Sequence, residues 1–87
     1  MIILNYTFFQ GDTWILSTPM TVDTVGYTGY CTAKQNNAVF VASVVIGTNV
    51  VATFTNTSLA KKGKFIYDIE IDGIDTRTLQ RGEIIVL

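Results

Sequence analysis

The sequence predicts an all-β fold of about seven short antiparallel strands, packed as a β-sandwich in one domain spanning residues 1–87. The clearest evidence is the segment Phe65 to Asp72, in which four apolar residues fall on one face and three acidic residues on the other. Alternation with a period of two is typical of a strand with one buried face. Turn residues recur about every 8–12 positions, as in sandwiches and small barrels. A hydrophobic content of 48% with 15% charged residues is sufficient for one core.

The N-terminal half of the chain is expected to contain three strands. Ile2 to Phe9 alternates apolar and polar residues, and Gly11-Asp12 then breaks the pattern. Thr13 to Thr18 forms the second strand, which Pro19 ends because proline has no N–H to donate to a ladder. Met20 to Val25 is expected to be a loop or a short edge segment. Tyr27 to Gln35 forms the third strand, with Cys31 on its apolar face.

The C-terminal half is expected to contain four strands. Ala38 to Ile46 and Val50 to Thr55 are nearly continuous in apolar residues, which indicates that both faces are covered. Residues 56–62 offer the one place for a helical turn, of at most one or two turns. Phe65 to Asp72 and Arg77 to Leu87 complete the set and are joined by a hairpin turn that begins at Asp72-Gly73.

The charge and hydropathy of the chain argue against nucleic-acid and membrane partners. The net charge is −1, and its six basic residues are scattered along the sequence, so a phosphate-binding surface is not expected. No apolar run approaches the roughly 20 residues that cross a bilayer. The first residues have no basic region and no small-residue cleavage site, so we expect no signal peptide and synthesis in the cytoplasm.

The residue types that carry catalysis or bind metals are scarce. The chain has no histidine and one cysteine, Cys31, which excludes an intramolecular disulfide and a Cys/His zinc site and favours a buried structural thiol. Asp68, Glu70 and Asp72 form the one acidic cluster, and a solvated strand face is favoured over a catalytic pair. Calcium binding by Glu70, Asp72 and Asp75 is the more serious functional alternative, but the spacing of these residues does not match an EF-hand loop. The sequence predicts no enzyme activity, no cofactor and no metal.

Several short motifs, in order, resemble a known family. These are Phe9-Gln10-Gly11-Asp12-Thr13-Trp14, the strand start Gly26-Tyr27-Thr28, the turn Leu59 to Gly63, the strand Tyr67-Asp68-Ile69-Glu70, and Leu79-Gln80-Arg81-Gly82-Glu83. Their layout is similar to that of small immunoglobulin-like modules of tailed bacteriophages, found at the N-terminus of baseplate upper proteins and in related fibre-associated proteins. The chain is shorter than typical members between Ser17 and Val25, and it ends at Leu87, where larger relatives continue into a fibre or receptor-binding region.

The resemblance covers residues ~2 to 87, and most of its motifs are turn and core residues, which specify a fold better than a task. It implies an immunoglobulin-like sandwich and a virion structural role in a baseplate, tail fibre or head fibre, as an attachment or spacer module. The expected core residues are Trp14, Tyr27, Phe54, Phe65 and Tyr67.

Excess apolar residues on strand positions that should face solvent predict an assembly face. The candidates are Val39, Val41, Val45, Val51, Ile66, Ile85 and Leu87. They favour a homo-oligomer or docking to other virion structural proteins, and the competing interpretation is a central strand covered on both faces.

Two other function classes stay open. Tyr30 lies on the opposite side of its strand from Tyr27 and Cys31, so it is the candidate exposed aromatic of a module that binds a host glycan. The chain would otherwise be a small phage inhibitor of a host protein. Binding to a glycan array distinguishes the first alternative, and capture of a partner from host lysate rather than from virions distinguishes the second.

Overall fold

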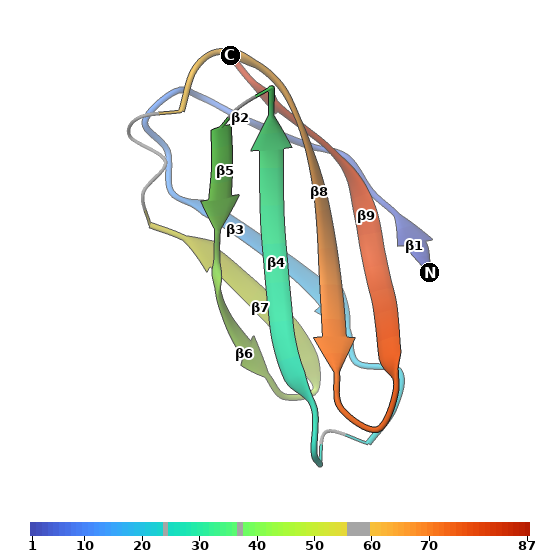
Figure 1. Ribbon diagram of the computed structural model, residues 1–87. Coiled ribbons are helices and arrows are strands. Elements are labelled where there is room, and N and C mark those ends of the chain that lie inside the picture. Colours follow the sequence, from blue (N-terminus) through green and yellow to red (C-terminus); the bar gives the residue numbers. More distant parts are fainter. Residues whose placement is uncertain (24, 37, 56–59) are drawn as a thin grey trace.

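The computed structural model describes residues 1–23, 25–36, 38–55 and 60–87 and shows an all-β protein. The described residues form nine strands in two packed sheets, whose arrangement is drawn in Figure 1. Their bounds are β1 Ile2–Ile3, β2 Tyr6–Phe8, β3 Trp14–Pro19, β4 Thr28–Gln35, β5 Ala38–Val41, β6 Ser43–Ile46, β7 Asn49–Phe54, β8 Gly63–Asp72 and β9 Thr76–Val86.

The two sheets have an immunoglobulin-type strand order. The large sheet has the order β1-β9-β8-β4-β5, with β2 also paired to β9, and the small sheet has the order β3-β7-β6. The succession β9-β8-β4 opposite β3-β7-β6 matches strands G-F-C opposite B-E-D of immunoglobulin domains. β8 and β9 are the two longest strands, and the hairpin between them forms one end of the elongated molecule.

The first expected strand is divided, and its pairing was predicted wrongly. β1 and β2 both pair with β9 in parallel, whereas an antiparallel strand was expected over Ile2 to Phe9. The interruption lies at Leu4 and Asn5, where the Asn5 side-chain oxygen accepts the Glu83 N–H at 2.9 Å. A side chain therefore replaces a backbone partner, and the parallel pairing depends on long-range contacts that a strand pattern does not encode.

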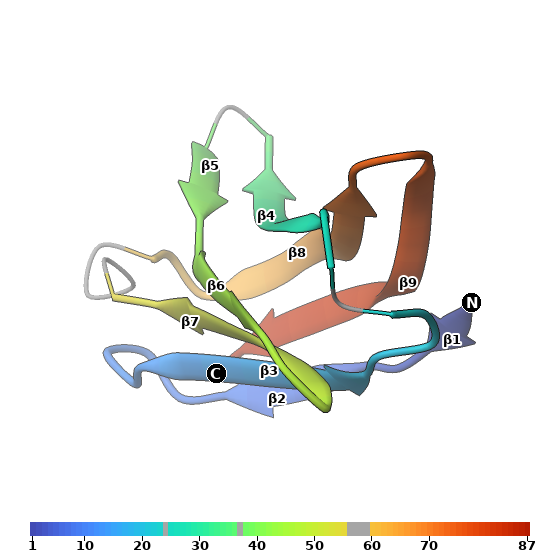
Figure 2. The ribbon, with the colours of Figure 1, turned by 90° about the horizontal axis from the view of Figure 1, so that it is seen from below.

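The continuous strand expected over Ala38 to Ile46 is also two strands, and they belong to different sheets. β5 pairs with β4 in the large sheet, while β6 pairs with β7 in the small sheet. The chain changes sheets at Ala42, whose N–H donates to the Cys31 carbonyl at 2.9 Å (Figure 2). The long apolar run thus reflects a strand that crosses between layers, with inward residues on both of its halves.

The expected helical turn over 56–62 lies largely outside the described residues, which omit 56–59. Ala60, Lys61 and Lys62, which are described, have no helical conformation. The other expected strands agree with β3, β4, β7, β8 and β9 to within a few residues at each end.

The core lies between the sheets and is centred on aromatic rings. Of the expected core residues, Trp14, Phe54, Phe65 and Tyr67 are buried, as predicted, and Tyr27 is only half-buried, because its hydroxyl reaches a polar partner at the end of the sandwich. The ring of Trp14 contacts those of Phe8, Phe40, Phe54 and Phe65 at centroid distances of 5.2–5.9 Å. Offset and edge-to-face contacts at such distances stabilise a core beyond the area that they bury.

A buried polar network ties the N-terminal segment to this core. Gln80 is 1% exposed, and its Nε2 donates to the hydroxyls of Tyr6 and Tyr67, each at 3.0 Å. The Tyr67 hydroxyl in turn donates to the Leu4 carbonyl at 2.6 Å. Because a buried amide is costly when unpaired, these bonds fix the position of the segment that links β1 to β2.

Candidate interaction surfaces

The side chains considered as catalytic or metal-binding candidates make structural contacts or lie apart from one another. Burial raises the pKa of the Cys31 thiol to about 12, with Asp68 adding a smaller effect, so the thiol stays protonated. Asp72 accepts a hydrogen bond from the Thr76 hydroxyl at 3.0 Å, and Asp75 is engaged by Tyr27 and Arg77. Within the described ranges, no three acidic or cysteine residues gather as metal ligands.

The seven candidate assembly residues do not form one face. Val39 and Val41 on β5, Ile66 on β8 and Ile85 on β9 belong to the large sheet. Val45 on β6 and Val51 on β7 are cross-strand partners in the small sheet. Leu87 follows β9 and donates its N–H to the Phe8 carbonyl at 2.9 Å. The single face expected from the sequence is therefore divided between the outer surfaces of two sheets.

The solvent-facing surface of the large sheet, which we call the outer face, carries the larger share of these residues. Val39, Val41 and Ile66 are 54%, 63% and 58% exposed, whereas Ile85 is half-buried. Strand register places outward residues in two cross-strand rows, Val39–Lys34–Ile66–Glu83 and Val41–Thr32–Asp68–Arg81. Partners in such rows have Cβ atoms about 5 Å apart, so the apolar and charged side chains form one continuous surface.

A shallow depression of about 350 Å³ lies along these rows. Its lining residues are Thr32, Lys34, Asn36, Ile66, Tyr67, Asp68 and Arg81. The two ion pairs found among the described residues, Lys64–Glu83 and Arg77–Asp75, do not use the charges of this depression. Tyr30 is 50% exposed and pairs with Glu70, two residues along the strand from the depression. The prediction that Tyr30 is exposed is confirmed.

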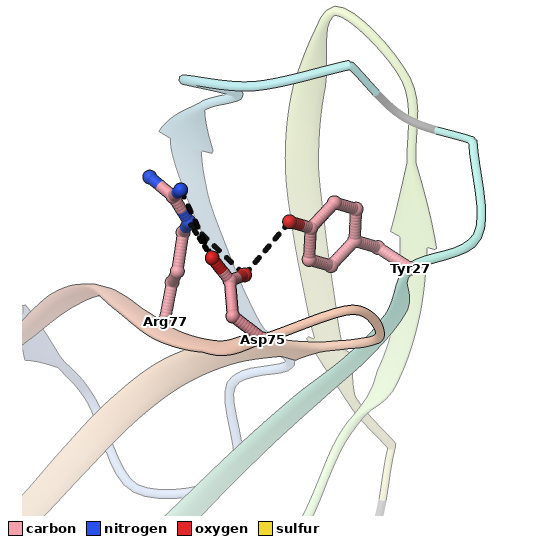
Figure 3. A network of polar contacts seen from close by, with 3 residues as sticks. All are labelled: Tyr27, Asp75 and Arg77. Atoms are coloured by element: carbon pink, nitrogen blue, oxygen red, sulfur yellow. Dashed lines mark hydrogen bonds and ion pairs between the residues drawn. The ribbon is translucent and has the colours of Figure 1, made fainter.

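A second surface, at the β8–β9 hairpin, was missed by the sequence reasoning (Figure 3). The Tyr27 hydroxyl donates to Asp75 Oδ1 at 2.7 Å, and Arg77 Nε contacts both carboxylate oxygens at 3.1 and 3.2 Å. Arg77 first, and Tyr27 second, hold the pKa of Asp75 below its usual range. The Asp75 hydrogen bond raises the pKa of Tyr27.

This network joins two connections that are far apart in the sequence. Gly73 in the hairpin packs directly on the Gly26 carbonyl, where any Cβ would collide with backbone. An Asx-type bond from Val25 N–H to Asp23, 3.1 Å, orders the connection that precedes β4. Locally, the sequence offers a tyrosine that follows a glycine and an Asp-x-Arg spacing. Both patterns are too common to predict the contact between Tyr27 and Asp75.

We call the surface formed by 20–27 and 73–77, without the undescribed residue 24, the loop end. Val25 is 80% exposed and Ile74 92% exposed there. The loop end therefore presents two aliphatic side chains from connections that are fixed to each other by hydrogen bonds and by backbone contact.

Comparisons with known proteins add no relative to this description. No protein-family model matches the chain, and no curated protein matches it. The described residues contain no helix with the length and apolar character needed to cross a bilayer.

Proposed function

We propose that the chain is a non-enzymatic structural module of a tailed-phage particle, which assembles with copies of itself and with other virion proteins through the outer face. The observation that carries the proposal is the exposure of Val39 and Val41 on β5 and of Ile66 on β8, the two strands that flank β4 in one sheet. The phage assignment is supported by the sequence resemblance, and the immunoglobulin-type strand order agrees with the fold that this resemblance implies.

The outer face has the composition of a protein contact. Its aliphatic residues lie on either side of Lys34, whose methylene stem extends the apolar surface while its ammonium group stays in water. Asp68 and Arg81 beside them supply charges that a partner would pair. A specific contact of standard size buries roughly 800 Å² on each partner.

The test is the solution mass across a dilution series, measured by light scattering at about 0.5 M salt so that long-range charge effects are screened. We expect a closed oligomer for the parent chain and a monomer for Ile66→Asp. Val45→Asp is the matched control, because Val45 is 70% exposed on the small sheet and its change should leave the mass unaltered.

Two results would contradict the proposal. A monomeric parent chain that also fails to bind isolated virion proteins would remove the assembly role. Equal effects of Ile66→Asp and Val45→Asp would remove the outer face as the site. Circular dichroism of each variant separates lost association from lost folding.

A second candidate function, binding of an acidic host glycan, is favoured by one observation. Tyr30 offers an exposed ring near a depression that carries Lys34 and Arg81, and an aromatic ring with nearby cations suits a sugar that bears a carboxylate. A glycan array tests it, with Tyr30→Ala and Arg81→Gln expected to lose any signal. An array without signal leaves the assembly function as the proposal.

A further inference from the structure

The charges of the chain are unequally distributed along its long axis, with an excess of basic residues at one end and of acidic residues at the other. β8 begins at one end of the sandwich and reaches the β8–β9 hairpin at the other, and β4 runs antiparallel to it (Figure 1). The end at which β8 begins, which we call the basic end, holds all four lysines, Lys34, Lys61, Lys62 and Lys64, against two acidic residues, Asp12 and Glu83, of which Glu83 pairs with Lys64. The loop end and the adjoining part of β8 hold four acidic residues, Asp23, Glu70, Asp72 and Asp75, with Arg77 as the one cation.

Each end also exposes apolar side chains. The loop end presents Val25 and Ile74, the two most exposed large apolar residues of the described chain. At the basic end Phe9 is 67% exposed, next to the backbone bonds that join Leu87 with the β2 end. A contact between the two ends would remove these apolar side chains from water, which favours association.

Both ends are ordered by hydrogen bonds before any contact forms. At the basic end Gln10 Nε2 donates to the Ala60 carbonyl at 3.2 Å, and Gln35 Nε2 to the Lys62 carbonyl at 3.5 Å. These bonds place the segment that carries Lys61 and Lys62. At the loop end the Tyr27–Asp75 bond holds the connection before β4 against the β8–β9 hairpin. Because both ends are already ordered, little conformational entropy is lost on docking.

We propose that the loop end of one copy docks on the basic end of a second copy, so that copies associate head to tail along their long axis. The occupant is a second copy because its acidic loop end and lysine-bearing basic end are complementary in charge and both expose apolar residues. Such a contact is heterologous, since different surfaces meet, and it builds a ring or a linear stack. The inference rests on the proposed assembly function and adds a second contact to it.

The experiment is done in the Ile66→Asp background, so that the outer face does not contribute, and at about 20 mM salt. Variant one carries Lys61→Glu and Lys62→Glu, which reverses exposed charges at the basic end. Variant two carries Glu70→Lys and Ile74→Lys, which changes the loop end without touching the Tyr27–Asp75–Arg77 contacts. Light scattering gives the mass of each alone and of an equal mixture.

We expect the background chain to form concentration-dependent species larger than a dimer, and salt at about 0.5 M to weaken this association at least tenfold. Each variant alone should be monomeric. Their mixture should give a dimer and nothing larger, because variant one keeps an intact loop end and variant two keeps an intact basic end. An outward-facing change on the small sheet, Val45→Asp, should leave the association intact.

A background chain that is monomeric at every salt concentration would overturn the head-to-tail contact. So would a mixture of the two variants that stays monomeric while the background associates. In both cases the proposed function keeps its own test, since the loss of an oligomer on Ile66→Asp at high salt does not involve the ends. Far-ultraviolet circular dichroism confirms that all variants are folded.

Discussion

Gly82 fixes the position of the N-terminal segment on β9. A Cβ at this position would collide with the Leu4 backbone carbonyl and would lie within 3 Å of Asn5 Oδ1. The same two residues join the segment between β1 and β2 to β9: the Leu4 N–H donates to the Arg81 carbonyl, and Asn5 Oδ1 accepts the Glu83 N–H. The absence of a side chain at one residue thus permits a parallel strand pair to form.

Gly82→Ala is therefore expected to displace the segment that links β1 to β2 and to lower the free energy of unfolding by about 1–3 kcal/mol. Urea unfolding gives the magnitude, and amide exchange at Ile3 and Leu4 should accelerate more than exchange in β8. Gly47→Ala is the control, because its Cβ would meet only the Asn49 carbonyl at 3.8 Å. Equal losses in the two variants would show that the close approach at Gly82 is not important.

Asp75 is the residue on which the polar contacts of the loop end converge. Its depressed pKa means that the folded state favours the carboxylate, so its contribution to stability is present above the usual aspartate pKa and is lost as pH falls through the folded value. A carbon-13 titration of the side-chain carboxyl is expected to show this depression.

The two partners of Asp75 differ in their expected effects. Arg77→Gln should raise the pKa of Asp75 more than Tyr27→Phe does, because the arginine has the larger influence. If the pKa of Asp75 in both variants matched that of the parent chain, neither Arg77 nor Tyr27 would contact Asp75 in solution.

At the scale of the element, the sequence predicted those strands whose evidence is local. The alternation in β8 reflects a strand between β4 and β9 with one face in the core, and Cys31 and Ala33 on β4 are buried as the pattern indicates. Pro19 marks the end of β3, as its missing N–H implies.

The sequence did not predict features that depend on partners far along the chain. The sheet change at Ala42 occurs within a nearly continuous apolar run, because alternate residues of both halves pack against the same core. The Tyr27–Asp75 bond joins residues 48 positions apart, and the spread of the assembly residues over two sheets follows from that same strand crossing. Composition and periodicity carry no information on which strands become neighbours.

The aromatic cluster around Trp14 links strands of both sheets. Trp14 lies on β3, and the four rings around it come from β2, β5, β7 and β8. No disulfide joins the sheets, since Cys31 is the one cysteine of the chain. The buried indole Nε1 has no hydrogen-bond partner among the described residues, which costs about 1–3 kcal/mol.

Trp14→Ala is expected to lower the free energy of unfolding by about 3–5 kcal/mol. Trp14→Phe should cost less than half as much, because it keeps a ring in the cluster and removes the unpaired N–H. Urea unfolding followed by circular dichroism measures both. Ile15→Ala, on the exposed side of the same strand, is the control and should have little effect. A phenylalanine variant as unstable as the alanine variant would contradict this account.

The pH dependence of the whole molecule follows from which groups it lacks and which it buries. The chain has no histidine, so no imidazole titrates between pH 5 and 8. Burial raises the pKa of the Cys31 thiol from 9.0 to about 12 and that of the Tyr67 hydroxyl from 10.0 to about 12. Each group ionises more easily when the chain is unfolded.

Stability is therefore expected to be complete below about pH 9 and to decline as pH rises toward 12, because the unfolded state releases these protons first. Unfolding in urea at a series of pH values, followed by the fluorescence of the buried Trp14, measures the decline. Cys31→Ala should make the decline between pH 9 and 12 shallower, since it removes one of the two groups. Identical slopes for the parent chain and Cys31→Ala would mean that the thiol is not buried in solution, and the tight packing of β4 against the core would then be wrong.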